Sequence, residues 1–398
     1  MTIDVTDAPI VDTSAIALQK NTADRDTAGV TAGDVGPLEG ILFDVYFFKG
    51  VHEDIATLPS LDKADAHAVF KTDKDGLLYL DKDSLTEGSW AYTDESGELV
   101  YPLGSVYVKE NTPIDGLLIA NEDGLLFTLT DGSDKTASDP AYQGDLTLKA
   151  GSSDKELTAE RVAGSYENAV AKGTVSVTKA DLDTDKSTPQ GDAALEGAEF
   201  TIYNRSAADI FYKGSLVKPG EAVDTIKTVY DEASQSYVAS MEANVLEYGT
   251  YEIKETKAPE GYNLADWSRT FTIRKDGEIH HFNQESKADT ADETGLNQTH
   301  EQCANDVIRG GIIIGKRDRE TGSYTALGNA ELAGAKFKIV NKSQHPVIVD
   351  GTSYDPDATV MEITAEETEV DGATIVAAVT ANDALPYGTY EVTEIGTG

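Results

Sequence analysis

The chain of 398 residues contains a single cysteine, Cys303. One cysteine excludes any disulfide within the chain, so a different covalent cross-link is needed wherever packing alone does not stabilise the fold. Side chains two residues apart in a strand point to the same face, so Cys303 is expected to lie on the same inward face as Asn305. This position favours a buried and inert thiol over a reactive one.

Long hydrophobic runs are also missing. No segment approaches the roughly 20 apolar residues that span a bilayer, and residues 1–30 show no apolar core of a signal peptide. The sequence therefore predicts no membrane-spanning segment. We expect the targeting signals to lie outside this chain.

Basic residues are scarce, with 32 Lys and Arg against 71 Asp and Glu and a formal net charge of −39 at pH 7. Nucleic acid and anionic membranes both require a cationic face, so neither is an expected partner. Apolar residues make up 39% of the chain, an ordinary fraction for a folded protein. The acidity therefore predicts a self-repelling surface around real cores rather than disorder.

Signals for metals and cofactors are weak. Residues 181–185 (DLDTD) begin like an EF-hand calcium loop, but Lys186 replaces the required glycine and Asp192 the closing glutamate. No HExxH spacing supports zinc, and no GxSxG nucleophile elbow or glycine-rich phosphate loop occurs. We predict no metal, no cofactor and no turnover enzyme.

The sequence does contain a repeat. The pattern NxVx(K/R)Gx(V/I)x(V/I)xK occurs at residues 168–179 and again at 305–316 with identical spacing. Such a match indicates that one unit ends near the Asn and the next begins with the strand leading to the Lys. Two landmarks recur in the same order along the chain: LxGxxF at 38–43, 195–200 and 332–337, and a Gly six residues before a Glu at Gly104/Glu110, Gly249/Glu255 and Gly388/Glu394.

Short alternating runs bounded by Gly, Asp, Asn and Ser fill the chain, and no helical apolar stripe of convincing length appears. This pattern predicts an all-β fold of tandem sandwich domains. Representative strands are expected at 174–179, 200–203, 250–255, 270–274 and 311–316. The predicted domains are a lead-in or linker at 1–13, a first domain with long insertions at 14–172, a second at 173–309, and a third at 310–398 that is cut short before its closing strands.

Three lysines are predicted to point into the cores. Side chains two apart in a strand share a face, so Lys179 lies with two valines, and by the same parity Lys20 and Lys316 lie with apolar neighbours. An inward lysine is costly unless it is paired or neutral. Burial lowers the pKa of its amine and so makes the nucleophilic form accessible.

Inward parity also holds for a glutamate late in each unit and for an asparagine at the end of the first two, namely Glu110, Glu255, Glu394, Asn168 and Asn305. Burial raises a carboxyl pKa, so such a Glu can share a proton with a neighbouring Lys. The amine can then attack the Asn side-chain carbonyl while the Glu polarises it and relays protons, and ammonia leaves. The product is a Lys–Asn isopeptide bond, formed once per unit with proximity supplied by folding. An ordinary buried ion pair is the alternative.

The segment YEIKETKAPEGY at residues 251–262 resembles the E-box YxLxETxAPxGY of Cna B-type domains, the prealbumin-like (SpaA-type) modules of pilins and surface adhesins of Gram-positive bacteria. Together with LEGAEFTIYN at 195–204 and the seam strings, the resemblance covers nearly all of the second domain. It implies an Ig-like or prealbumin-like sandwich in which Lys179, Glu255 and Asn305 form the bond described above.

The first unit departs from this pattern. Residues 106–117 (VYVKENTPIDGL) lack both family tyrosines and have an altered ETxAP core, although LEGILFDVYFF at 38–48 still fits. The resemblance implies the same roles for Lys20, Glu110 and Asn168.

The third unit keeps Lys316 and Glu394, but only four residues follow that Glu, whereas fifty separate Glu255 from Asn305. Its acceptor Asn is absent from the chain. We therefore expect no cross-link there, and an unpaired sheet edge that accepts a strand in trans.

The resemblance implies an extracellular protein anchored to a Gram-positive cell wall, a pilin subunit or adhesin stalk stiffened by autocatalytic isopeptide bonds. Its expected partners are neighbouring pilin or stalk domains, and sortase through regions outside this chain, because neither an LPxTG signal nor a pilus-shaft lysine motif is found. The alternative is an adhesin head that binds host matrix or glycan through insertions in the first domain, between Lys49 and Trp90 and between Ala120 and Glu160. Accessory modules of a secreted enzyme are a third class, which requires a catalytic domain elsewhere.

Overall fold

The structure is a computed structural model that describes residues 11–12, 17–22, 31–52, 54–111, 113–119, 123–130, 145–148, 162–283 and 302–397. The predicted lead-in at 1–13 lies outside these residues except for 11–12. The described chain is almost entirely β, so the all-β prediction is confirmed; its helical segments are two single 3₁₀ turns, η1 (Ile55–Thr57) and η2 (Leu61–Lys63). No helix among the described residues is long and apolar enough to cross a membrane.

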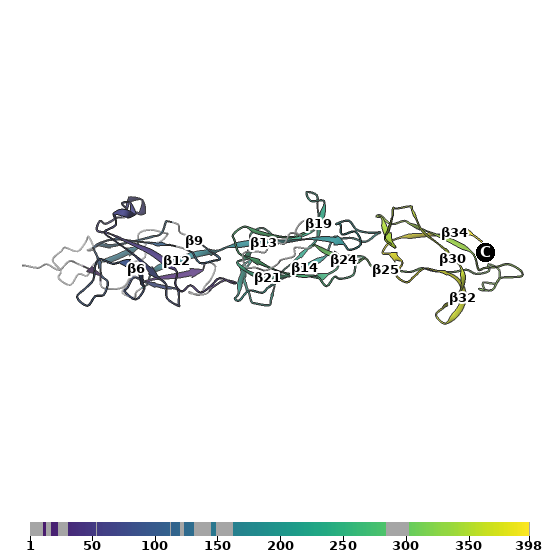
Figure 1. Cartoon of the computed structure of the whole chain (residues 1–398), viewed down its shortest axis with the longest axis horizontal. Coiled ribbons are helices and arrows are strands. Elements are labelled where there is room, and N and C mark those ends of the chain that lie inside the picture. Colours follow the sequence, from purple (N-terminus) through teal and green to yellow (C-terminus); the bar gives the residue numbers. More distant parts are fainter. Residues whose placement is uncertain are drawn as a thin grey trace, which may run out of the picture.

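Three groups of strands follow one another along the long axis of the molecule (Figure 1). We call them unit 1 (β1–β12), unit 2 (β13–β24) and unit 3 (β25–β34). Each unit has its own sheets and a buried apolar core made almost wholly of its own residues, so the chain is a linear array rather than one core.

Unit 1 is a sandwich of a six-stranded sheet, ordered β11-β10-β8-β3-β4-β6, and a four-stranded sheet, ordered β5-β2-β12-β9, with β1 paired to β7. Aromatic side chains such as Phe43, Phe70 and Trp90 fill its core. Its strands are β1 (Val11–Asp12), β2 (Ala17–Thr22), β3 (Leu42–Phe48), β4 (Ala66–Lys71), β5 (Leu77–Tyr79), β6 (Leu85–Ser89), β7 (Tyr101–Pro102), β8 (Gly104–Glu110), β9 (Leu117–Ile119), β10 (Leu125–Thr130), β11 (Asp145–Leu148) and β12 (Val162–Val170).

Unit 2 repeats the sandwich. One sheet is ordered β18-β19-β13-β20 with β23 and β24 on the other edge of β13, and the facing sheet is ordered β17-β14-β21-β22. Its strands are β13 (Lys172–Asp181), β14 (Glu199–Asn204), β15 (Ile210–Tyr212), β16 (Ser215–Val217), β17 (Ala222–Lys227), β18 (Val229–Asp231), β19 (Ser236–Ser240), β20 (Leu246–Glu247), β21 (Gly249–Lys257), β22 (Ser268–Ile273), β23 (Glu278–Phe282) and β24 (Cys303–Asn305).

Unit 3 has smaller sheets, ordered β26-β32-β31 and β30-β27-β34, with the pairs β25-β33 and β28-β29 beside them. The strand expected at 311–316 is shorter than predicted. The strands of this unit are β25 (Arg309–Gly310), β26 (Ile313–Gly315), β27 (Lys336–Asn341), β28 (Val347–Val349), β29 (Thr352–Tyr354), β30 (Thr359–Thr364), β31 (Glu366–Val370), β32 (Ala373–Val379), β33 (Leu385–Pro386) and β34 (Tyr390–Gly396).

In units 1 and 2 the strand that carries the Lys lies beside the last strand of the unit. β2 pairs with β12 and β13 pairs with β24, and both pairs are parallel. Parallel neighbours need a long crossover between them, and here the crossover is the whole rest of the unit. Each unit therefore begins and ends in the same sheet.

The seam between units 1 and 2 is a turn of unit 1 seated in the end of unit 2. Gly33 has φ +54, and a Cβ on it would lie 2.1 Å from the carbonyl oxygen of Tyr248, so only glycine fits. The next residue, Asp34, accepts hydrogen bonds from the amide of Ala207 at 2.9 Å and the hydroxyl of Thr250 at 2.6 Å. Tyr248 also packs into the core of unit 1, so the two units share apolar as well as polar contacts.

The seam between units 2 and 3 repeats this arrangement. Gly191 has φ +58, and a Cβ on it would lie 2.1 Å from the carbonyl oxygen of Tyr387. Asp192 accepts hydrogen bonds from the amide of Gln344 at 2.9 Å and the hydroxyl of Thr389 at 2.6 Å. We call these two Gly-Asp turns the seam turns.

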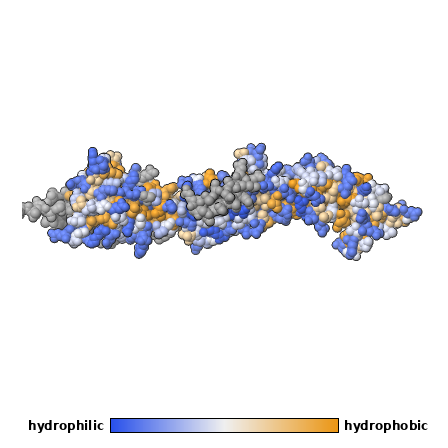
Figure 2. Space-filling view, in the orientation of Figure 1, coloured by the Kyte–Doolittle hydropathy of each residue, from blue (hydrophilic) through white to orange (hydrophobic). Residues whose placement is uncertain are grey.

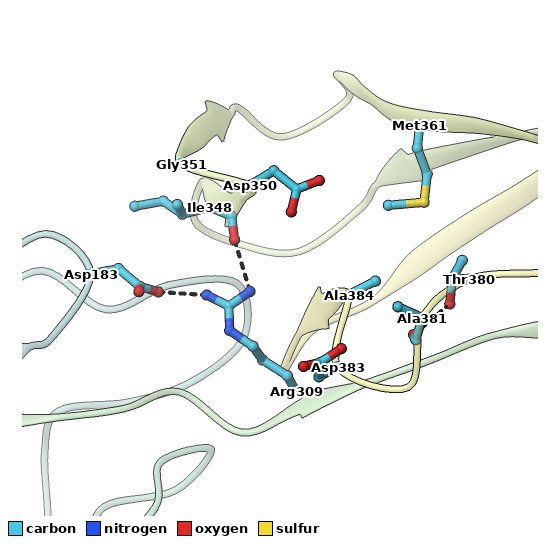
Figure 3. A pocket seen from close by; sticks show the side chains of 10 residues that line it. All are labelled: Asp183, Arg309, Ile348, Asp350, Gly351, Met361, Thr380, Ala381, Asp383 and Ala384. Carbon is cyan, nitrogen blue, oxygen red and sulfur yellow. Dashed lines mark hydrogen bonds and ion pairs between the residues drawn. The ribbon is translucent and has the colours of Figure 1, made fainter.

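Arg309 adds a second contact at the seam between units 2 and 3 (Figure 3). Its guanidinium donates to Asp183 at 2.6 Å and to the carbonyl oxygen of Ile348 at 3.0 Å. Asp183 belongs to unit 2 and Ile348 to unit 3, so the arginine bridges them. The polar pocket beside it is lined by Asp350 and Asp383 from unit 3.

Candidate cross-linking sites

The site in unit 2 joins three fully buried side chains from three strands: Lys179 on β13, Glu255 on β21 and Asn305 on β24. The Asn305 amide nitrogen donates to both carboxylate oxygens of Glu255, at 2.9 and 3.0 Å. The Lys179 amine lies 3.7 Å from the same carboxylate. The structure thus brings all three predicted residues together.

Local sequence and strand pairing explain how these groups meet. In β21 the residues at alternate positions, Tyr251, Ile253 and Glu255, are fully buried, which places the carboxylate on the core face. On the opposite sheet Lys179 stands directly across from Cys303 in the parallel pair β13–β24. The Lys179 amine donates to the Cys303 carbonyl oxygen at 3.0 Å, a contact with the strand that carries Asn305.

Burial shifts both ionisable groups toward their neutral forms. Desolvation lowers the pKa of Lys179, and the nearby Glu255 opposes that shift only in part. Desolvation likewise raises the pKa of Glu255 against the opposing effects of Lys179 and of the Ala265 amide, which donates to it at 2.9 Å. A neutral amine and a protonated carboxyl are the states that amide exchange requires.

Cys303 takes part in the same cluster. Its thiol is fully buried and donates to the Asn305 carbonyl oxygen, with the sulfur 3.6 Å from that oxygen. Burial raises the pKa of the thiol to about 12, so it keeps its proton and remains a weak donor. Parity in the sequence predicted burial of this residue, but not its contact with the side-chain amide of Asn305.

The site in unit 1 has the same plan, with Lys20 on β2, Glu110 on β8 and Asn168 on β12. Their exposed fractions are 1%, 2% and 0%. The Lys20 amine lies 2.9 Å from Glu110 Oε2, and the Asn168 amide nitrogen donates to Glu110 Oε1 at 3.0 Å. Within the described residues, the buried carbonyl oxygen of Asn168 has no hydrogen-bond partner.

The two sites share one register. In unit 1 the Asn168 strand runs parallel to the Lys20 strand with Thr22 opposite the Asn, and in unit 2 Asp181 stands opposite Asn305. In both cases the Lys lies two residues before the position that faces the Asn. In both units, therefore, the Lys and the Asn lie on neighbouring parallel strands with the same offset.

The predictions that Lys316 and Glu394 point into the core of unit 3 were wrong. Lys316 and Glu394 pair directly, at 2.7 and 2.9 Å, but 24% and 35% of their side chains are exposed, so neither points into a closed core. No described strand of unit 3 stands where β22, β23 and β24 cover the site of unit 2. Parity placed these side chains on the correct face of their strands, but a face is buried only when another element covers it.

Formation of the predicted Lys20–Asn168 isopeptide bond is expected to depend on pH. Burial lowers the pKa of Lys20 to about 8, with Glu110 opposing the shift. Only the neutral amine attacks, so below that pKa the rate should fall about tenfold per pH unit, and above it the rate should level off. The measurement is the mass of the Lys20–Asn168 peptide against time in newly synthesised chain, on both sides of this pKa. A rate that does not change with pH would contradict the assignment.

Comparison with known proteins places the middle of the chain in a family. Residues 173–287 match the family model of SpaA, a prealbumin-like fold domain. No curated protein sequence matches the chain.

Several solved structures are similar to the chain at low identity. The Bacillus anthracis TIE protein is 18% identical over 96% of this chain, with a TM-score of 0.43, and the chain spans only 45% of the length of that protein. A C-terminal fragment of the pilus adhesin SpaC from Lactobacillus rhamnosus GG is 17% identical, with 67% of this chain and 84% of that chain covered and a TM-score of 0.31. The Streptococcal ancillary pilin is 15% identical, with 96% and 90% covered and a TM-score of 0.25. Residues 173–287 therefore belong to the SpaA family of prealbumin-like domains, and the resemblance seen in the sequence of this unit is confirmed.

Proposed function

We propose that units 1 and 2 each form one Lys–Asn isopeptide bond without an external enzyme, and that the chain serves as a stiff structural segment of a cell-surface protein, a pilin subunit or adhesin stalk. The observation that carries this proposal is the register shared by the two sites, which sets a buried Lys, Glu and Asn against one another twice. A chance buried ion pair has no reason to recur with an asparagine at the same offset.

The reaction balances within the site. The neutral Lys179 amine attacks the side-chain carbonyl carbon of Asn305, and a new carbon–nitrogen bond forms. The bond from that carbon to the Asn305 amide nitrogen breaks, and one proton of the lysine amine passes through Glu255 to the departing nitrogen, which leaves as ammonia. Glu255 already contacts that nitrogen, so it is placed to relay the proton. Each site reacts once, so the chain is not a turnover enzyme.

The bonds lie where tension would act. Each one would join a strand near the start of a unit to its last strand, β2 to β12 and β13 to β24. In a chain whose units follow one another lengthwise (Figure 1), a pulling force that enters at one seam crosses the bond and leaves at the next. The intervening strands then carry little load, which suits a stalk that must resist shear and proteolysis.

Surface anchoring to a Gram-positive cell wall, with sortase acting outside this chain, belongs to the same proposal and is supported by the SpaA-family match of unit 2. The adhesin-head alternative stays a prediction. The first insertion of unit 1 folds onto its own sheet, where Phe48, Tyr107 and Leu126 form a small buried cluster. Of the second insertion, between Ala120 and Glu160, the structure describes only 123–130 and 145–148.

Intact mass spectrometry of the purified chain tests the proposal. We expect a deficit of two ammonia molecules relative to the sequence mass, with peptide mapping that joins Lys20 to Asn168 and Lys179 to Asn305. Replacing either lysine by Arg should restore one ammonia and leave the other bond intact. A mass equal to that of the unmodified sequence would refute the proposal.

A further inference from the structure

The side-chain amide of Asn305 is contacted at both of its polar atoms. Its nitrogen donates to the two carboxylate oxygens of Glu255, at 2.9 and 3.0 Å. Its carbonyl oxygen accepts from the Cys303 thiol, with 3.6 Å between the sulfur and the oxygen. Glu255 therefore holds the nitrogen that would depart as ammonia, and Cys303 lies against the oxygen on which negative charge would develop.

The surroundings of the thiol favour its action as a hydrogen-bond donor. Hydrophilic residues cover much of the molecular face drawn in Figure 2, whereas Cys303 is fully buried in the apolar core of unit 2 together with Trp267 and Phe282. Burial raises the pKa of the thiol to about 12, so the sulfur keeps its proton at neutral pH and is not itself a nucleophile. In a site without water, a fixed donor acts more strongly on a nearby charge than it would in solvent.

Charge appears on the Asn305 carbonyl oxygen only while the proposed reaction is under way. When the Lys179 amine attacks the carbonyl carbon, an electron pair of the C=O bond moves onto the oxygen, and it returns when ammonia leaves. A thiol is a weak donor to a neutral amide oxygen, in keeping with the distance of 3.6 Å. The same hydrogen bond to a negatively charged oxygen is stronger. The thiol is therefore placed to stabilise the transition state more than the starting state, as catalysis requires.

The main chain of Cys303 contacts the other reacting group. Its carbonyl oxygen accepts from the Lys179 amine at 3.0 Å. Cys303 thus has its backbone at the amine and its side chain at the amide oxygen of Asn305. A substitution at this position removes the side-chain contact and leaves the backbone acceptor of the amine in the chain, so the role of the thiol can be tested by itself.

Unit 1 offers a comparison within the same chain. Among the residues that the structure describes, the buried carbonyl oxygen of Asn168 has no hydrogen-bond donor. The two sites therefore share the Lys, the Glu and the Asn, but they differ in what contacts the amide oxygen. The thiol contact is a feature of unit 2 that lies outside the shared set of three residues.

We propose that the Cys303 thiol is a catalytic hydrogen-bond donor of unit 2, which stabilises negative charge on the Asn305 carbonyl oxygen while the bond to Lys179 forms. This inference rests on the cross-linking function proposed for the unit. The thiol keeps its proton throughout, so the balance of the reaction is unchanged: one carbon–nitrogen bond forms, one breaks, and Glu255 passes a proton to the departing ammonia. Cys303 acts on the rate of the reaction and not on its product.

Cys303→Ser and Cys303→Ala are the matched variants that test this role. Both remove the buried sulfur and so lose similar packing in the core, but only the serine variant has a side-chain donor. In whole chain newly made by cell-free synthesis, formation of the Lys179–Asn305 cross-linked peptide is followed against time by mass spectrometry. We expect the alanine variant to form the bond roughly tenfold more slowly than the serine variant.

The Lys20–Asn168 bond is the internal reference, because Cys303 lies on β24 of unit 2 and the rate in unit 1 should be the same in both variants. Equal rates of the unit 2 reaction in the serine and alanine variants would overturn the inference, since packing would then account for the residue. A different pH of half-maximal rate in the two variants would also overturn it, because the side chain would then act on the Lys179 amine. An unaltered chain without the Lys179–Asn305 bond would instead refute the cross-linking function of unit 2 itself.

Discussion

Glu255→Gln is expected to leave unit 2 without its cross-link, so that the chain is heavier by one ammonia and less stable. A bond between Lys179 and Asn305 closes a loop of well over a hundred residues. By analogy with disulfides, it should raise the free energy of unfolding by about 5 kcal/mol. For a unit of this size, that loss lowers the melting temperature by roughly 10 to 20 °C. Intact mass and calorimetry on the same preparation measure both effects.

The matched control is Glu252→Gln on the same strand. Glu252 lies on the outer face of β21, where Arg205 donates to it at 2.6 Å, and exposed pairs of this kind contribute less than about 1 kcal/mol. We expect the control to keep the cross-link and nearly all of the stability. If Glu255→Gln still lost ammonia at the normal rate, Glu255 would not be the proton relay.

Asp192→Ala is expected to loosen the seam between units 2 and 3. It removes two charge-assisted hydrogen bonds, from the backbone N–H of Gln344 and from the Thr389 hydroxyl. Together these bonds stabilise the contact between the units by about 3 kcal/mol. The amide of His345, which donates to the carbonyl oxygen of Gly191 across the seam, should then exchange its hydrogen about 100-fold faster. Hydrogen exchange followed by mass spectrometry of that peptide measures the change.

Asp383→Ala makes the same change of charge beside the same seam (Figure 3) and serves as the control. Asp383 is exposed and lines the pocket, so its replacement should leave exchange at the seam unchanged. Equal exchange in Asp192→Ala and the unaltered chain would show that the Gly-Asp turn does not hold the units together. Faster exchange in both variants would show that the loss of one negative charge, rather than the loss of the Asp192 hydrogen bonds, loosens the seam.

The order of the repeat, the all-β class and the inward face of Lys179, Glu255 and Asn305 could be predicted from the sequence. These features depend on a local rule, because side chains alternate along any strand whatever it pairs with. The same rule found Lys20, Glu110 and Asn168 despite the altered E-box of unit 1. The choice of the strand-end asparagines as partners for distant lysines came instead from the order of the repeat and from the chemistry of the three groups.

The tertiary structure alone decided what lies beside those faces. The common register that sets Lys20 near Asn168 and Lys179 near Asn305 comes from parallel pairing of strands at opposite ends of a unit, which no local pattern fixes. The contact between the Cys303 thiol and the Asn305 carbonyl depends on the same pairing.

Unit 3 shows the limit of the local rule. The sequence placed Lys316 and Glu394 inward, and they do pair, but they remain partly exposed because burial is decided by strands that come from elsewhere. The seam turns were missed for a related reason. Gly191 and Asp192 look like an ordinary surface turn until the fold brings Tyr387 and Thr389, nearly two hundred residues away, into contact with them. The sequence by itself determined which way each side chain faces, and only long-range packing determined what each one meets.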